Sequence, residues 1–147
     1  MTDPFLEAAI AEAEQGLVEG GIPIGSVLVV DDQIVGRGHN RRIQKGSPTL
    51  HGEMDALENA GRLPASAYRR AAIYTTLSPC DMCTGAILLY GIPRVVIGEN
   101  RTFMGAEDLL RSRGVEVIVV GDQRCVEMME SFIAAHPEVW DEDIGEG

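Results

Sequence analysis

One histidine and two cysteines in the middle of the chain have the residue types and spacing of metal ligands. His51 lies upstream of a Cys-x-x-Cys pair formed by Cys80 and Cys83. Zinc takes imidazole and thiolate ligands, and a catalytic zinc site uses three of them and leaves the fourth position to water. The three residues therefore predict a catalytic zinc site.

A carboxylate, Glu53, lies two residues after this histidine. Zinc lowers the pKa of its bound water to about 7, which makes hydroxide available at neutral pH. We expect Glu53 to take the proton and to deliver it to a ring nitrogen and then to a departing amine. The pattern His-x-Glu with Pro-Cys-x-x-Cys resembles the signature of zinc nucleobase deaminases.

Two other interpretations of the cysteine pair are a structural zinc knuckle and a redox pair. Structural zinc sites usually close with four protein ligands. The other candidate ligands are His39, His136 and Cys125, and none is placed to close the site. Neither interpretation requires Glu53, so the sequence favours the catalytic site.

Local sequence also predicts how the cysteines are presented. Ser78 is a good N-cap, Pro79 suits the first helical position, and Asp81 completes a weak capping box. Cys80 and Cys83 would then lie on one face of the first turn, where the helix dipole favours thiolates.

A second helix is expected to begin near His51, with Thr49 as its candidate cap. Gly52 costs about 1 kcal/mol relative to alanine within a helix, and close approach of its N–H to a ligand is one reason to accept that cost. Residues two apart face opposite sides of a helix interior, so His51 and Glu53 can share a pocket only at the helix end. Two helix N-termini are thus expected to meet at one metal.

Length and composition are those of an ordinary globular chain. The 147 residues are expected to form a single domain over 1–147, and the hydrophobic fraction is 45%. Three cysteines, two of them in the metal motif, favour a reducing compartment. Because the sequence shows no secretion signal and no membrane-spanning run, a cytoplasmic location is expected.

The charge balance is strongly acidic, with a net charge of −11. A protein that grips phosphates needs a basic surface. The arginine pairs Arg41–Arg42 and Arg69–Arg70 are short and typical of solvated surface. We therefore expect a small neutral or cationic substrate, and neither nucleic acid nor membrane as a partner.

The hydrophobic pattern predicts alternating helices and strands. Helices are expected at residues 3–20, 49–60, 81–90, 106–113 and 125–135, and strands at 26–30, 33–36, 72–76, 94–98 and 115–120. The first helix is expected to bury Phe5, Ala9, Ile10, Ala13 and Leu17, and residues 39–48 to form a polar loop. Residues 87–90 are apolar on every side, so they belong either to the core or to a subunit interface.

From about Gly20 to its C-terminus, the chain resembles the fungal-type cytosine deaminases, the free-base branch of the zinc-dependent cytidine deaminase-like superfamily. The segments that carry the resemblance are residues 36–40, 50–53, 57–59, 74–87, 90–94, 98–100, 113–114 and 142–146. The resemblance implies an α/β fold, a three-layer α/β/α sandwich with a central five-stranded mixed sheet. It also implies one zinc ion per subunit and a homodimer.

The resemblance further implies how a nucleobase is held. Asn40 and the backbone N–H of Gly52 would hold the ring carbonyl. The backbone carbonyl of Ser78 and the carboxylate of Asp143 would accept hydrogen bonds from the exocyclic amine.

Three apolar residues would enclose the base. The resemblance assigns Phe103 and Trp140 to an aromatic lid and Ile24 to the pocket wall. Two departures from the family pattern lie nearby: Asp55 adds a carboxylate near the site, and the loop 104–106 is one residue shorter than in the family.

The expected reaction is hydrolytic deamination of a free nucleobase, cytosine to uracil and ammonia before others. Alternative substrates are a modified cytosine, isocytosine, guanine or a creatinine-like ring. A nucleoside would need room for ribose, which a closed C-terminal tail should deny. Two further alternatives are a non-catalytic zinc-stabilised module, against which Glu53 argues, and a polynucleotide-editing enzyme, against which the net charge argues.

Overall fold

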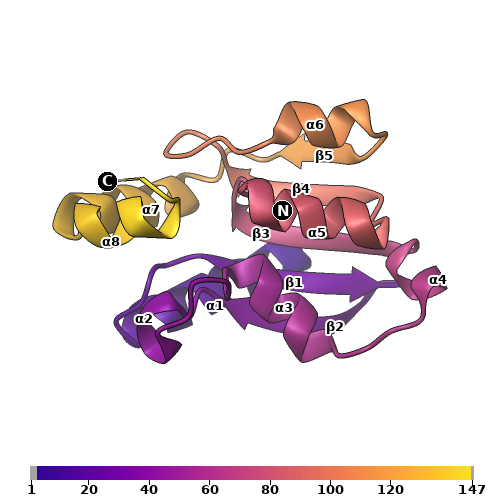
Figure 1. Cartoon of the computed structure of the whole chain (residues 1–147), viewed down its shortest axis with the longest axis horizontal. Coiled ribbons are helices and arrows are strands. Elements are labelled where there is room, and N and C mark those ends of the chain that lie inside the picture. Colours follow the sequence, from indigo (N-terminus) through magenta and orange to yellow (C-terminus); the bar gives the residue numbers. More distant parts are fainter. Residues whose placement is uncertain (1–2, 147) are drawn as a thin grey trace.

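A five-stranded mixed sheet forms the centre of the structure, a computed structural model that describes residues 3–146. In chain order its strands are β1 (Gly25–Val30), β2 (Gln33–His39), β3 (Ala71–Leu77), β4 (Arg94–Glu99) and β5 (Glu116–Val119). Across the sheet the order is β2-β1-β3-β4-β5 (Figure 1). β1 is antiparallel to β2 and β3, whereas β3, β4 and β5 are parallel.

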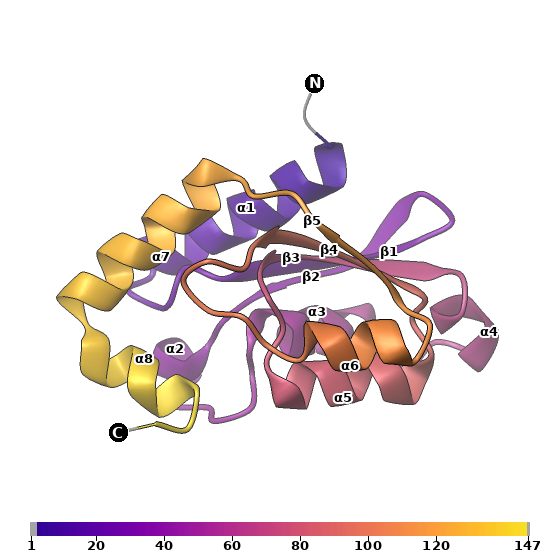
Figure 2. The same ribbon diagram turned by 90° about the horizontal axis from the view of Figure 1, so that it is seen from above.

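Helices cover both faces of this sheet (Figure 2). One face carries α1 (Pro4–Val18) and α7 (Gln123–Ala135), and the other carries α3 (Gly52–Ala60), α5 (Asp81–Tyr90) and α6 (Glu107–Ser112). The short helices α2 (Arg42–Lys45) and α8 (Pro137–Asp143) lie at one end of the sheet, and α4 (Ala65–Tyr68) lies at the other. The three-layer α/β/α fold expected from the sequence is thus confirmed.

The turn between β1 and β2 is set by two acidic residues. Asp31 and Asp32 have φ values of 49° and 61°. These left-handed values belong to the two-residue turns whose twist matches that of paired strands. The hairpin makes β2 an edge strand, and β2 leads directly into Asn40.

Aliphatic and β-branched residues build the interior of the sheet. Val27, Leu28, Ile73, Val95 and Ile97 are all 0% exposed. Because helices cover both faces, almost every residue of β1, β3 and β4 is buried, and the usual in–out alternation is absent from these strands. The packed sheet holds the N-termini of α3 and α5 at a fixed separation.

Most expected elements are confirmed, and the differences have local causes. On α1, Leu6 and Gly16 are buried in place of Phe5 and Leu17. The strand expected at 33–36 continues to His39, which pairs with Gly25 of β1. The expected polar loop 39–48 contains α2, and the C-terminal tail contains α8. Over residues 3–146, no helix has both the length and the apolar composition needed to cross a membrane.

The last turn of α5 is only partly buried. Ile87 is fully buried, whereas Leu89 and Tyr90 are 77% and 44% exposed. Tyr90 stacks on Tyr68 of α4, with ring centroids 4.8 Å apart. The core interpretation of residues 87–90 is therefore wrong for Leu89 and Tyr90, because within residues 3–146 the short helix α4 covers that side of α5 only in part.

Candidate active site

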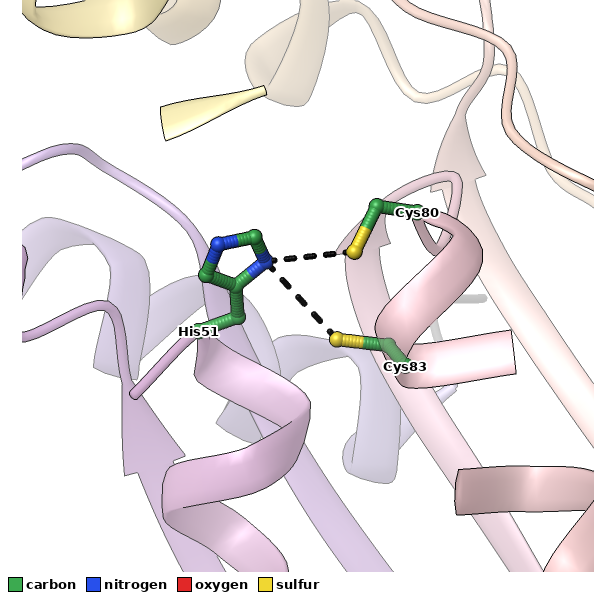
Figure 3. Close-up of side chains that lie close together, drawn as sticks. All are labelled: His51, Cys80 and Cys83. Carbon is green, nitrogen blue, oxygen red and sulfur yellow. Dashed lines mark hydrogen bonds between the residues drawn. The ribbon is translucent and has the colours of Figure 1, made fainter. Parts of the chain in front are cut away.

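The three expected metal ligands converge between two helix N-termini (Figure 3). His51 directly precedes α3, Cys80 directly precedes α5, and Cys83 lies in the first turn of α5. The Nδ1 atom of His51 lies 3.3 Å from the Sγ atom of Cys80 and 3.8 Å from that of Cys83. All three ligand atoms lie within 4.8 Å of one another.

These separations fit a tetrahedral zinc ion. Zinc–sulfur bonds of about 2.3 Å and zinc–nitrogen bonds of about 2.05 Å place tetrahedral N and S ligands about 3.6 Å apart. The two observed distances, 3.3 and 3.8 Å, lie on either side of that value. Within residues 3–146, no other group of three or more His, Cys, Asp or Glu side chains is arranged to hold a metal.

The helix starts differ from the expected ones. The N-cap of α5 is Cys80 instead of Ser78, and that of α3 is His51 instead of Thr49. Neither helix start has a side-chain capping hydrogen bond, so the capping box expected at Asp81 is wrong. The physical reason is that both N-cap side chains turn toward the metal position and away from their own helix.

The second ring nitrogen of His51 faces a carboxylate at the end of α8. Nε2 lies 3.2 Å from Oδ1 of Asp143. Burial lowers the pKa of His51, but hydrogen bonds with Asp143 and Cys80 outweigh it and raise that pKa to about 10. An Nε2–H that donates to Asp143 leaves Nδ1 for the metal, the usual arrangement of metal-binding histidines.

The two thiols differ in acidity because they are hydrogen-bonded to each other. The hydrogen bond with Cys83 lowers the pKa of Cys80 to about 4 despite burial, and His51 contributes to this lowering. The same hydrogen bond, together with burial, raises the pKa of Cys83. Zinc binds cysteine in its thiolate form, which the lowered pKa of Cys80 favours, and metal binding would also require Cys83 to lose its proton.

Glu53 faces the same pocket as His51. It lies in the first turn of α3, is 4% exposed, and lines the cavity beside the ligands. Burial raises the pKa of Glu53 to about 7, and the negative charge of Cys80 adds to the rise. Gly52, which lies between His51 and Glu53 in the sequence, packs tightly against Ile24. A Cβ at Gly52 would lie 3.1 Å from the carbonyl oxygen of Ile24. The helix-end placement expected for His51 and Glu53 is present.

A small cavity of about 20 Å³ adjoins the ligands, and an open groove of about 580 Å³ leads to it. The cavity is lined by Ile24, His51, Glu53, Leu77, Ser78, Cys80, Phe103, Trp140, Asp143 and Ile144. Phe103 and Trp140 meet edge to face across it, with ring centroids 5.7 Å apart. Of these residues, Leu77 and Ile144 were not anticipated from the sequence.

Asn40 is fully buried next to the cavity and is joined to it through Asp143. Its Nδ2 donates to Oδ2 of Asp143 at 3.0 Å, and its Oδ1 accepts from the backbone N–H of Arg42 at 2.9 Å. These two bonds fix which side of the amide carries the donor. Asp55, in contrast, does not line the cavity and contacts the end of β2.

Arg42 is a site residue that sequence reasoning missed. Its Nε donates to Oδ1 of Asp143 at 2.6 Å, and its Nη1 donates to Oε1 of Glu142 at 2.7 Å. Arg41 is paired as well, with Asp55. The interpretation of Arg41–Arg42 as solvated surface is therefore wrong, because carboxylates that are distant in the sequence pair with both.

Glu107 was also missed, and it joins Asn100, which follows β4, to Ser78, which follows β3. This buried carboxylate accepts hydrogen bonds from the Ser78 hydroxyl at 2.6 Å and from Nδ2 of Asn100 at 3.2 Å. The backbone N–H of Gly105 donates to the same Ser78 oxygen at 3.0 Å. A Cβ at Gly105 would lie only 1.8 Å from the Pro79 carbonyl oxygen, so only glycine fits there.

Several known proteins are similar to this chain in sequence or fold. The chain is 58% identical over 142 residues to a cytosine deaminase of Candida albicans, covering 96% of this chain and 95% of that protein. It is 40% identical to a tRNA-specific adenosine deaminase of Streptococcus pyogenes serotype M18, over 71% of this chain and 67% of that protein. A solved structure from work on A-to-I editing by tRNA:A34 deaminases superposes with a TM-score of 0.73 at 28% identity, covering 85% of this chain and 98% of that one.

A family model also matches, and it spans the chemistry described above. The model of the cytidine and deoxycytidylate deaminase zinc-binding region matches residues 2–99. That segment contains His51, Cys80, Cys83 and Glu53. With two thirds of its length matched, and with its ligand atoms at zinc-binding distances, the chain belongs to the zinc-dependent cytidine and deoxycytidylate deaminase family.

Proposed function

We propose that this chain converts a free nucleobase, cytosine, to uracil and ammonia by hydrolysis. One observation carries the proposal: a buried carboxylate, Glu53, lines the same small cavity as His51 and Cys80, two of the three residues placed to bind zinc. The Candida albicans relative, called a cytosine deaminase, matches over nearly the whole chain, which supports cytosine as the substrate.

His51, Cys80 and Cys83 would hold the zinc ion. Bound there, zinc supplies a Lewis acid that makes water a nucleophile at neutral pH. Glu53 takes a proton from the attacking water and passes it to the ring nitrogen. Glu53 then takes the second proton from the hydroxyl that has added to the ring carbon and delivers it to the amine, which leaves as ammonia while the ring carbon becomes a carbonyl.

Polar groups around the cavity would orient the base. Asn40 Nδ2 and the N–H of Gly52 donate to the ring carbonyl in this proposal, and the Ser78 carbonyl and Asp143 accept from the exocyclic amine. Supporting this, Asn40 and Asp143 already pair at 3.0 Å, so a base that enters between them finds a donor and an acceptor side by side. When the base enters, its carbonyl and its amine replace the Asn40–Asp143 hydrogen bond, so no buried polar group is left unpaired.

The residues at the mouth of the cavity favour a base without ribose. Phe103, Trp140 and Ile144 surround it, and the last residues of α8 are tied to α2 by Arg42. A nucleoside would have to place its ribose where these residues lie. Size exclusion of this kind separates cytosine from cytidine more strongly than the loss of one contact does.

Ammonia release from a panel of rings tests the proposal. The panel contains cytosine, cytidine, 5-methylcytosine, isocytosine, guanine, adenine and creatinine, each offered to the zinc-loaded protein. We expect cytosine to turn over with a kcat/KM at least about 100-fold above that of cytidine, since a ribose that does not fit disrupts orientation. A Glu53→Gln preparation run in parallel measures any contaminating deaminase. Preference for cytidine, or turnover of guanine alone, would contradict the proposal.

Nucleic acid is not the substrate in this proposal, although some relatives are called tRNA-specific. The net charge of −11 opposes the counterion release that drives binding to phosphates. Arg41 and Arg42 are already paired with Asp55, Glu142 and Asp143, so their charges are neutralised within the chain.

We further propose a homodimer in which a second copy covers the exposed turn of α5. Leu89 and Tyr90 border a groove with Leu63 and Tyr68, and this apolar surface supports the proposal. Sedimentation should therefore show a dimer, and Leu89→Glu should shift it to monomer. Val18→Glu, a matched change at an 82% exposed position on the opposite face, should leave the dimer intact. A wild-type monomer would refute the dimer without affecting the proposed chemistry.

A further inference from the structure

One buried carboxylate holds the residues on both sides of Asn40. Asp55 is 2% exposed, and its Oδ2 accepts from the backbone N–H of His39 at 3.1 Å and from Nε of Arg41 at 3.0 Å. Asn40 lies between these two donors in the sequence. The same oxygen atom therefore fixes the chain immediately before and immediately after Asn40.

Asn40 is fixed by its own bonds as well. Its backbone N–H donates to the Ile24 carbonyl at 2.9 Å, and the backbone N–H of Arg41 donates to the Leu50 carbonyl at 2.9 Å. Within this framework the side-chain amide has only one orientation that satisfies the N–H of Arg42. A shift of the His39–Arg41 backbone would therefore move the amide donor directly.

Asp55 itself is rigidly placed because α3 and β2 approach closely. A Cβ at Gly38 would lie 2.4 Å from the backbone nitrogen of Ala56 and 2.8 Å from the Cβ of Asp55. Asp55 follows Glu53 by two residues on α3, so the two carboxylates leave the helix on different sides. Glu53 faces the cavity, and Asp55 faces the end of β2.

The outer side of this junction is charged. The ring of His39 lies between Oε1 of Glu12 at 2.9 Å and Oε1 of Glu19 at 2.8 Å. Arg41 Nη1 approaches the same Glu19 oxygen at 3.9 Å. His39 and Arg41, the two residues that donate to Asp55, thus also contact Glu19, the C-cap residue of α1. These contacts restrict both residues to the observed position.

We propose that Asp55 is a positioning residue for substrate recognition. Through His39 and Arg41, it sets the distance between the amide of Asn40 and the carboxylate of Glu53, which α3 carries. The inference rests on the proposed function, in which Asn40 holds the ring carbonyl of the base. Asp55 does not touch the base, so its effect passes entirely through Asn40.

Asp55→Asn tests this role with little change in shape. The amide keeps one acceptor oxygen but removes the charge that holds Arg41. We expect KM for cytosine to rise about 10-fold, since displacement of a positioning group by a fraction of an ångström weakens the oriented complex. We expect kcat to change by less than about threefold, because Glu53 and the metal ligands stay in place. We also expect the variant to retain one zinc ion per chain.

A double-mutant cycle separates positioning from general stability. If Asp55 acts through Asn40, the Asp55→Asn change adds no further rise in KM to an Asn40→Ala protein. Independent, multiplicative effects of the two changes on KM would overturn the inference. So would a KM within twofold of wild type for Asp55→Asn.

Asp122 offers a matched control. It accepts from the backbone N–H of Arg124 at 2.9 Å and from Nε of Arg124 at 3.1 Å, the same pair of donor types that Asp55 holds. It lies at the start of α7 and does not line the cavity. Asp122→Asn should lower the melting temperature and leave KM unchanged.

Amide hydrogen exchange tests the inference without turnover. In substrate-free protein, Asp55→Asn should speed exchange of the His39 amide by about 10-fold or more, since its acceptor is weakened, and Asp122→Asn should not. Unchanged exchange would overturn the inference. Wild-type protein that fails to deaminate cytosine contradicts the proposed function alone. Should Asp55→Asn fail to fold, Arg41→Gln removes one of the two bonds from a partly exposed position and takes its place.

Discussion

A Glu53→Gln variant is expected to retain one zinc ion per chain and to lose about 10³-fold or more in kcat, since positioned proton transfer typically contributes 10²–10⁴-fold. Two carboxylates, Glu53 and Asp143, line the cavity together with His51 and Cys80. Asp143 already accepts hydrogen bonds from Asn40, Arg42 and His51. These three partners hold the carboxylate of Asp143 in place, and in the proposed function its remaining acceptor site binds the exocyclic amine, so the proton carrier is Glu53.

Glutamine suits the test because it has the shape of glutamate, but its amide cannot take up and release a proton at neutral pH. The cavity keeps its volume, so KM for cytosine should change by less than about threefold while kcat falls. Steady-state kinetics with metal analysis on the same preparation give both quantities. A variant that kept its zinc and its full turnover would refute the assigned role of Glu53.

Glu58 provides the control on the same helix. It is an exposed glutamate of α3, five residues beyond Glu53. Glu58→Gln changes the net charge and the helix composition by the same amount as Glu53→Gln. We expect Glu58→Gln to leave kcat, KM and zinc content unaltered. A fall in kcat seen only in Glu53→Gln would then result from the position of Glu53 in the cavity.

The metal ligands and Glu53 could be predicted from the sequence because their chemistry restricts both residue type and spacing. His51 and Glu53 are two apart, and the cysteines are three apart, so each pair is a local pattern. The strands could be predicted because their pattern is local as well. Runs of Val and Ile such as those of β1 and β4 are typical of strands that are buried because helices cover both faces of the sheet. The helix starts were less predictable. The side chains of the two N-cap residues, His51 and Cys80, turn toward the metal position and do not cap their helices.

The supporting contacts could not be predicted, because they join residues that are remote in the chain. Arg42 and Asp143 are 101 residues apart, and Ser78 and Glu107 are 29 apart. Nothing in the local sequence of Arg42 distinguishes a site residue from surface. Its pairing follows only once the sheet places α2 and α8 at the same end, as Figure 1 shows.

Asp55 illustrates a different limit. Its distance from Glu53 in the sequence suggested a second carboxylate near the substrate. Helical geometry turns it to another side of α3, where Gly38 leaves space for close packing. Proximity in sequence therefore identified a relevant residue but not the neighbour on which it acts.

A Cys83→Ser variant is expected to lose its zinc, its turnover and a large part of its thermal stability. Cys83 is fully buried at the start of α5, and serine is a poor zinc ligand. Zinc present at about 1,000 times its dissociation constant stabilises the folded chain by about 4 kcal/mol. For a chain of this size, losing that amount lowers the melting temperature by roughly 8–16 °C.

Cys125→Ser separates the loss of metal from the loss of a buried sulfur. Cys125 is 1% exposed in α7, so the same substitution there buries a hydroxyl, which costs about 1–3 kcal/mol in proteins. It should keep one zinc per chain and full turnover. Treating wild type with a strong chelator should reproduce most of the fall in melting temperature seen in Cys83→Ser, the remainder matching the fall in Cys125→Ser, and adding zinc back should restore wild type but not the variant. If Cys83→Ser bound zinc as wild type does, the ligand set would be wrong, because two protein ligands cannot hold the ion against a chelator in the way three do.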